Sequence, residues 1–120
     1  MRNSPAAMPA VDVGDIVWVE LDDIRGTEQS GRRPALVLTS QAFHEMSRRA
    51  IICPISSKMR SWPTVVALPP GLKTRGVVLI DQVRSIDRAA RMFHTIERVP
   101  QDVVQDVRAR LGALLGTEIG

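Results

Sequence analysis

The feature that most constrains the fold is the apolar run from Asp15 to Leu21, which reads DIVWVEL. Successive side chains of a strand point to opposite faces, and here both faces are nearly apolar, with Ile16 and Trp18 on one and Val17 and Val19 on the other. A sheet with one face in water would carry polar residues on that face. The run therefore predicts a strand inside a closed barrel or between two layers.

Further short runs with the character of strands follow, and turn residues separate them. From Asp81 to Ile86 polar and apolar residues alternate with period two, so the strand that begins at Gly76 is expected to run on into this segment. The predicted strands after the first span residues 33–39, 49–56, 64–68, 76–80 with the continuation to 86, and 92–99.

A short helix is predicted over residues 41–48, between the second and third strands. Ser40 is a good N-cap residue for it, because its hydroxyl can accept from the first free backbone N–H groups. Phe43 and Met46 lie three residues apart and are placed on its inner side, and His44 is placed on its surface.

A longer helix is predicted after Pro100, since proline suits the first turn of a helix. Its apolar residues recur at helical spacing as far as Gly116 and form one wide face. This face serves the core or a contact between two copies, and the core is the preferred interpretation. The chain is thus predicted to be mainly β with appended helices, in the form of a small β-barrel closed by an amphipathic C-terminal helix.

One domain is expected for 120 residues. Residues 1–12 are interpreted as a flexible N-terminal arm and residues 13–118 as the single domain. The only cysteine, Cys53, lies in an apolar run and is predicted to be buried as a small hydrophobe, with no internal disulfide. There is no signal-peptide core and no apolar span of transmembrane length, so we expect a cytoplasmic protein without a membrane partner.

The charge balance favours a polyanionic partner. The net charge is +3, the isoelectric point is near 10.0, and the basic residues are almost all arginine. The planar guanidinium of arginine matches phosphate oxygens in two-point contacts. Aromatic residues make up only 3% of the chain, which argues against an extended platform on which nucleic-acid bases stack.

The turn from Gly26 into the second strand carries the strongest local signal, GTEQSGRRPALVLT. Gly26 and Gly31 permit close approach of a ligand to the backbone. Pro34 restricts Arg33 to an extended backbone and so helps to fix the direction of its guanidinium. The pattern suits phosphate binding by Arg33 beside Glu28, and the alternative is a hairpin loop with solvated charges.

Other catalytic patterns are weak or absent in the sequence. His44 and His94 are far apart and have no recognisable orienting partner, so a catalytic histidine pair is not favoured. The histidines and the cysteine show no metal-ligand spacing, and no metal or cofactor is predicted. The chain has no GxGxxG fingerprint, P-loop or GxSxG elbow. Ser56, at the end of a predicted strand beside a basic loop, could point its hydroxyl toward the same mouth as Arg33.

Four motifs taken in series resemble the MazF/PemK family of toxin endoribonucleases. They are GDIVWVELD from Gly14, the GTEQSGRRPALVL run, CPISS from Cys53, and GVVLIDQVRSID from Gly76, and the likeness covers residues 13–116. The resemblance implies an SH3-like barrel of the CcdB/MazF type, a homodimer, and sequence-specific, metal-independent cleavage of single-stranded RNA. It also implies a cognate MazE-like antitoxin with an acidic tail, with DNA binding through the antitoxin complex.

The resemblance assigns catalytic roles to three residues. Arg33 matches the family's arginine before the proline, and Glu28 matches the acidic residue of its loop. Ser56 stands where the family more often has threonine, so the hydroxyl is kept but the methyl group that restricts the rotamer is lost. The expected reaction is attack by the RNA 2′-hydroxyl on the adjacent phosphorus, which leaves a 2′,3′-cyclic phosphate and a 5′-hydroxyl.

The rest of the predicted RNA-binding set lies on the flanking loops. Basic residues there would hold the RNA backbone, and polar residues would read base edges. The predicted RNA-binding residues are Arg25, Thr27, Gln29, Arg32, Ser57, Lys58, Arg60, Asp81 and Gln82.

Two branches related to this family fit less well. The Kid/PemK branch uses a histidine before the loop glutamate and an arginine two residues before the DQ aspartate, where this chain has Thr27 and Leu79. The gyrase-poison function of CcdB relatives is linked to a C-terminal tryptophan, and this chain ends in GTEIG. The alternatives left open are a non-catalytic RNA-binding module and a protein-directed toxin. Glu28 is expected either to act as the base or to orient Arg33.

Overall fold

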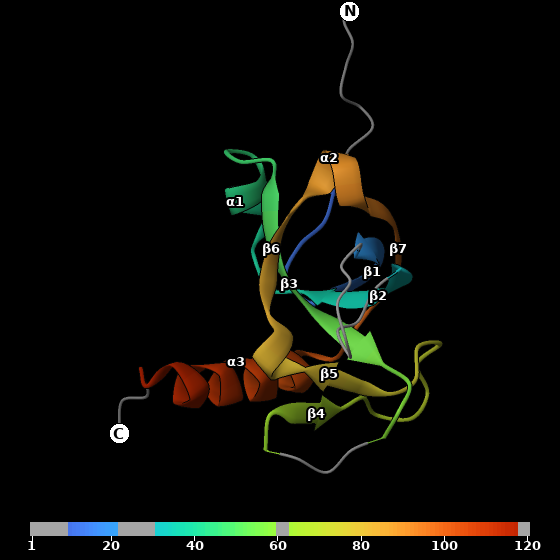
Figure 1. The fold of residues 1–120 in the computed structure, drawn as a ribbon, viewed down its shortest axis with the longest axis vertical. Coiled ribbons are helices and arrows are strands. Elements are labelled where there is room, and N and C mark those ends of the chain that lie inside the picture. The colour runs from blue at the N-terminus through green and yellow to red at the C-terminus, as the bar shows by residue number, and fades with distance from the viewer. Residues whose placement is uncertain (1–9, 22–30, 60–62, 118–120) are drawn as a thin grey trace, which may run out of the picture.

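The structure is a computed structural model that describes residues 10–21, 31–59 and 63–117. It is built on an antiparallel sheet in the order β4, β5, β3, β2, β1, β7, with β6 paired to β3 beside that path (Figure 1). The strands are β1 Asp15–Leu21, β2 Gly31–Val37, β3 Arg49–Ser56, β4 Val65–Ala67, β5 Val77–Leu79, β6 Arg84–Asp87 and β7 Met92–Arg98.

The prediction of a mainly β fold with a C-terminal helix is confirmed, but the sheet does not close into a barrel. Among the described strands, no ladder joins β7 at one end of the sheet to β4 or β6 at the other. Along one of its edges, β3 pairs with two strands in turn. It pairs with β6 at Arg49–Ile52 and then with β5 at Ile55 and Ser56. The sheet therefore branches at β3, and among the described strands its two ends, β4 and β7, are not paired with each other.

The two faces of the sheet bury different clusters, as the two apolar faces of β1 predict. Ile16 belongs to a core cluster that includes Leu36 and Val78 and is covered by α3. Val17 and Val19 belong to a second cluster on the opposite face, together with Ile52 and Ile86. All three β1 side chains are fully buried, so β1 lies between two layers.

Helix α3 (Gln101–Leu115) follows Pro100 and covers the sheet with only part of its apolar face. Val103, Val104 and Val107 are buried, whereas Leu114 and Leu115 are exposed, and Figure 1 shows the end of α3 extending past the strands. The preferred interpretation of this face therefore holds for its first half. No helix in the described part of the chain is long and apolar enough to cross a bilayer.

Two predictions of local secondary structure are wrong. The alternating segment after β5 does not continue that strand, because the 3₁₀ turn η2 (Ile80–Gln82) redirects the chain and β6 then pairs with β3. The predicted helix 41–48 is reduced to one turn, α1 (Gln41–His44), and Met46, expected inside, is 80% exposed. In the first case a contact distant in sequence, the β3–β6 ladder, decides the outcome.

His44 is buried, contrary to its predicted surface position. Its Nδ1 donates to the carbonyl oxygen of Val11 at 2.9 Å, and its Nε2 lies 2.7 Å from the hydroxyl oxygen of Thr39. Asp12 also joins this corner, because its carboxylate accepts from the backbone N–H of Gln41 at 2.9 Å. Ordered contacts thus reach back to Val11, within the segment predicted as an arm.

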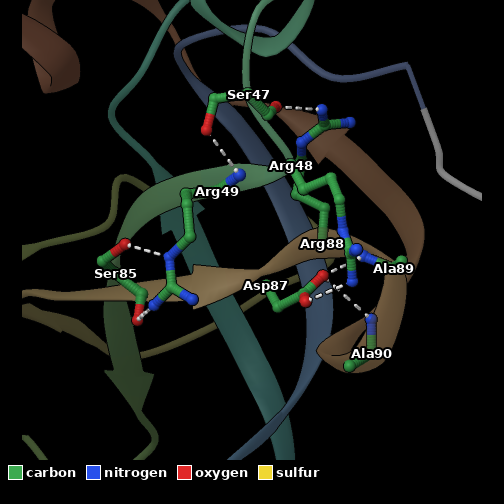
Figure 2. Close-up of polar contacts among 8 residues, drawn as sticks. All are labelled: Ser47, Arg48, Arg49, Ser85, Asp87, Arg88, Ala89 and Ala90. Atoms are coloured by element: carbon green, nitrogen blue, oxygen red, sulfur yellow. Dashed lines mark hydrogen bonds and ion pairs between the residues drawn. The ribbon is translucent and has the colours of Figure 1, made fainter.

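A polar network ties β6 and α2 (Arg88–Arg91) to the start of β3 (Figure 2). One carboxylate oxygen of Asp87 accepts from the backbone N–H of Ala89 at 2.9 Å, and the other accepts from Arg48 at 2.6 Å. Arg49 donates to the hydroxyl and carbonyl oxygens of Ser85 at 2.9 and 3.1 Å. Arg88 donates to the carbonyl oxygen of Ser47 at 2.7 Å. Side chains thus hold this corner where the β3–β6 ladder ends.

Replacing Asp87 with asparagine is expected to lower stability in a pH-dependent way. Burial alone would raise the pKa of Asp87, but the bonds from Arg48 and Ala89 hold it below the ordinary value of 3.8. A lowered pKa means that the carboxylate stabilises the fold above that pH and loses this effect as pH falls through the lowered value. In urea titrations, the difference between wild type and Asp87→Asn should shrink below pH 3.8.

Asp106→Asn is the control for this prediction. Asp106 makes a comparable bond at 3.0 Å to Arg110, but one helical turn away on the surface of α3, where such pairs contribute little. Equal losses in the two variants, or a difference for Asp87→Asn that does not change with pH, would contradict the role given to the network.

Candidate functional site

The pairing of β2 with β3 brings two of the predicted catalytic residues to one face of the sheet. The ladder joins Ala35 to Pro54 and Val37 to Ile52. The ladder ends at the pair of Ala35 and Pro54, and Arg33 and Ser56 each lie two residues beyond it, so alternation along the strands places both on the same side as that pair. That side also carries the second core cluster, so both residues stand at the rim of a buried layer.

Arg33 is half-buried and has an unused donor. Within the described part of the chain, its Nε is buried and has no hydrogen-bond partner. A buried donor without a partner costs about 1–3 kcal/mol, so a native fold keeps one where a ligand or another group can satisfy it. An oxyanion placed at the rim would supply that acceptor, because the guanidinium remains charged.

Ser56 is buried at the end of β3, and its hydroxyl is oriented. Its Oγ accepts from the backbone N–H of Lys58 at 3.1 Å, which leaves the hydroxyl hydrogen to donate elsewhere. On its other edge Ser56 pairs with Val77 of β5, and Gly76 lies directly against its carbonyl group. A side chain at position 76 would overlap that carbonyl, so Gly76 is needed for this approach.

Four of the predicted RNA-binding residues lie in the turn after β3 and in η2. Ser57 and Lys58 are exposed in the turn after β3, and Asp81 and Gln82 lie in η2.

Burial, helped by the charge of Asp81, raises the pKa of Cys53 to about 12. The thiol therefore stays protonated at neutral pH and is not a nucleophile, in agreement with its predicted structural role.

Arg32 points to the other face of β2. It forms an ion pair with Glu20 at 3.6 Å, and its guanidinium carbon lies 4.4 Å from the centre of the Phe93 ring. Together with Trp18 and His94, Arg32 and Phe93 line a hollow of about 640 Å³. The structure thus separates Arg32 from the face that carries Arg33 and Ser56.

Five of the predicted residues cannot be placed. Glu28, Arg25, Thr27, Gln29 and Arg60 lie outside the described residues. Sequence reasoning, in turn, gave no functional role to Gly76, which lies against the Ser56 carbonyl group, or to Arg75, which lines a hollow together with Ser57. The only signal for them in the sequence is a glycine directly before an apolar run.

The histidines and the acidic residues do not suggest another catalytic centre. Both ring nitrogens of His44 are engaged in the buried corner described above, while His94 is exposed on β7. Among the residues that the structure describes, no group of three or more His, Cys, Asp or Glu side chains could hold a metal ion.

Comparison with known proteins gives a consistent result. Residues 12–115 match the model of a family described as PemK-like, MazF-like toxin of type II toxin-antitoxin system. The chain is 39% identical over 106 residues to endoribonuclease PemK of Escherichia coli, with 85% of this chain and 80% of that protein covered.

Solved structures agree with this match. The crystal structure of MazF from Deinococcus radiodurans superposes with a TM-score of 0.83 at 40% identity, and the match covers 89% of this chain and 97% of that one. A MazE–MazF crystal structure from the same organism has a TM-score of 0.78 at 38% identity, covering 91% and 98%.

A matched pair of glycine variants tests the packing around Ser56. Gly76 and Gly71 both have positive φ, at +128° and +98°, so alanine at either position is strained by about 1–3 kcal/mol. Only at Gly76 does the new methyl group also overlap the Ser56 carbonyl, whereas at Gly71 it meets nothing within 4 Å.

We therefore expect Gly76→Ala to lower the free energy of unfolding clearly more than Gly71→Ala. Gly76→Ala should also shift the backbone NMR signals of Ser56 and Val77. Urea unfolding and amide spectra of the two variants measure both effects. Equal destabilisation without a shift at Ser56 would show that the close approach is unimportant.

Proposed function

Because this chain belongs to the PemK-like, MazF-like toxin family of type II toxin–antitoxin systems, we propose that it is an endoribonuclease that cuts single-stranded RNA beside Arg33 and Ser56. The observations that carry this proposal are the β2–β3 ladder, which ends two residues short of Arg33 and Ser56, and the Nε of Arg33, which is buried and unpartnered in the described part of the chain. A positively charged donor next to a hydroxyl donor suits a phosphodiester.

The proposed reaction uses the RNA as its own nucleophile. The 2′-hydroxyl oxygen forms a bond to the adjacent phosphorus while the bond to the 5′-oxygen breaks, giving a 2′,3′-cyclic phosphate and a 5′-hydroxyl. A base takes the proton from the 2′-oxygen, and the leaving 5′-oxygen gains one. Arg33 stabilises the charge that builds on the phosphorane, and Ser56 donates its hydroxyl hydrogen to the same phosphate.

Other residues are proposed to bind or orient the RNA. Glu28 is the proposed base or the group that orients Arg33. Lys58, with Arg25 and Arg60, would hold the backbone, which makes binding depend on salt. Arg32 lies on the face of β2 opposite Arg33, so it would contact RNA only if the RNA chain also passes over that face. The proposed contacts to bases come from Thr27, Gln29, Ser57, Asp81 and Gln82.

The proposed partners are an antitoxin and a second copy of this chain. One solved structure similar to this chain holds MazE together with MazF. We propose a MazE-like antitoxin whose acidic tail orders on the basic rim around Arg33, by charge complementarity and folding on binding. Cytoplasmic location and a homodimer belong to the same proposal.

The test is cleavage of a long single-stranded RNA by purified protein in EDTA, with the new ends mapped chemically. Arg33→Ala and Ser56→Ala should each lower the cleavage rate about a hundredfold or more, as is typical when one positioned donor to a developing charge is removed. Arg110→Ala and Ser85→Ala are matched controls away from this face and should keep the wild-type rate.

The outcomes separate the competing functions. Discrete cuts with cyclic-phosphate and 5′-hydroxyl ends, lost in both site variants, support the proposal. Intact RNA from folded wild-type protein would instead favour a non-catalytic RNA-binding module or a protein-directed toxin. Cuts that persist in Arg33→Ala would mean that the reaction takes place elsewhere on the molecule.

A further inference from the structure

A second hollow begins at the residue directly after Ser56. It has a volume of about 480 Å³ and lies between the turn that follows β3 and the connection from β4 to β5. Its size falls within the usual range of small-ligand sites, roughly 300–1,000 Å³. The residues that line it include Ser57, Met59, Pro69, Leu72, Thr74 and Arg75.

The floor of this hollow is fixed by the core. Leu68 and Leu72, which both line it, also pack against the core cluster under α3. The backbone N–H of Leu68 donates to the carbonyl oxygen of Gly76 at 2.9 Å and closes the β4–β5 connection. Because Gly76 in turn lies against the carbonyl group of Ser56, the hollow and the candidate catalytic residue have a fixed relative position.

The rim of the hollow is held by Glu97 of β7. Its two carboxylate oxygens accept from the backbone N–H groups of Lys73 and Thr74 at 3.0 and 2.7 Å. Burial alone would raise the pKa of Glu97, but these bonds and the nearby Lys73 charge lower it, so the carboxylate is ionised at neutral pH. The two backbone N–H groups hold its negative charge at the rim, and Glu97 is not among the described residues that line the hollow.

The chemistry of the lining matches a nucleotide. Arg75 is exposed and is the only charged residue among the described residues that line the hollow, so the hollow attracts an anion. Met59, Pro69 and Leu72 offer apolar surface to the face of a base, and Ser57 offers a hydroxyl. Single-stranded RNA presents this combination, since its bases can unstack and its phosphates are exposed.

We infer that this hollow, which we call the flanking subsite, binds the nucleotide next to the scissile step, with Arg75 on its phosphate and Met59, Pro69 and Leu72 against its base. The inference rests on the proposed ribonuclease function. Ser57 makes the connection, since it follows Ser56 in the chain and also lines the hollow. The floor of the hollow packs on the α3 side of the sheet, whereas Arg33 and Ser56 lie on the side of the second cluster, so an RNA strand with its scissile phosphate at Ser56 reaches this lining by passing around the end of β3.

The experiment compares two substrates, built from a cleavage site mapped with the wild-type protein. One is the scissile dinucleotide alone, and the other carries an additional nucleotide on each side. For the longer substrate, Arg75→Ala should raise KM about tenfold or more, as expected for loss of a hydrogen bond to a charged group, and should leave kcat unchanged. For the dinucleotide, Arg75→Ala should behave as wild type.

Lys73→Ala is the matched control, because Lys73 is an exposed cation on the same connection that does not line the hollow. Alanine keeps the backbone N–H that Glu97 accepts, so the rim is preserved. This variant should bind the longer substrate like wild type. If both variants raise KM equally, the effect is general electrostatic attraction, and the flanking subsite is overturned.

A double-mutant cycle between protein and substrate makes the test specific. Replacing a flanking phosphate with an uncharged methylphosphonate should weaken wild type about as much as Arg75→Ala does, and should not weaken Arg75→Ala further. Additive effects at the phosphates on both sides of the cut would overturn the inference while the ribonuclease function stands. If folded wild-type protein cuts no long RNA, there is no cleavage site to map, so the proposed function fails and the inference fails with it.

Discussion

The structure depends on the pairing of β3 along both of its edges. One edge joins β2, and the other joins β6 and then β5, so one strand connects the two layers of the sheet and carries side chains of both main core clusters. The change of partner from β6 to β5 comes just before Ser56. The candidate catalytic hydroxyl therefore sits where β3 is held by β5 on one side and faces the end of β2 on the other.

The fold could be predicted well where a segment carries its own signal. β1 and β3 have the predicted bounds, because both faces of each are apolar and only one interpretation buries them. The prediction fails where distant contacts decide. The residues after β5 alternate between polar and apolar like a strand, but the chain changes direction at η2 and β6 then pairs with β3. His44 is buried because Thr39 and Val11 satisfy its ring, which no local pattern shows.

The candidate site divides in the same way. Arg33 and Ser56 could be proposed from the sequence because each lies in a motif, and the ladder between β2 and β3 explains how two motifs 23 residues apart come to neighbouring strands. Arg75 could not, since it stands in a connection with no motif and gains its place only through the packing of Gly76 on Ser56 and the bonds from Glu97 to its turn. A site composed of turns is specified by tertiary contacts, which sequence patterns record poorly.

The turn that follows β3 also explains how a serine hydroxyl can have a defined orientation at the end of that strand. Serine lacks the methyl group that restricts a threonine side chain, so its hydroxyl is free to rotate unless something holds it. Here the N–H of Lys58 donates to Oγ at 3.1 Å and supplies that restraint from the backbone. The turn that begins at Ser57 therefore orients the hydroxyl with its backbone and lines the hollow with its side chains, so in the proposed reaction it would couple the chemistry at Ser56 to the RNA bound beside it.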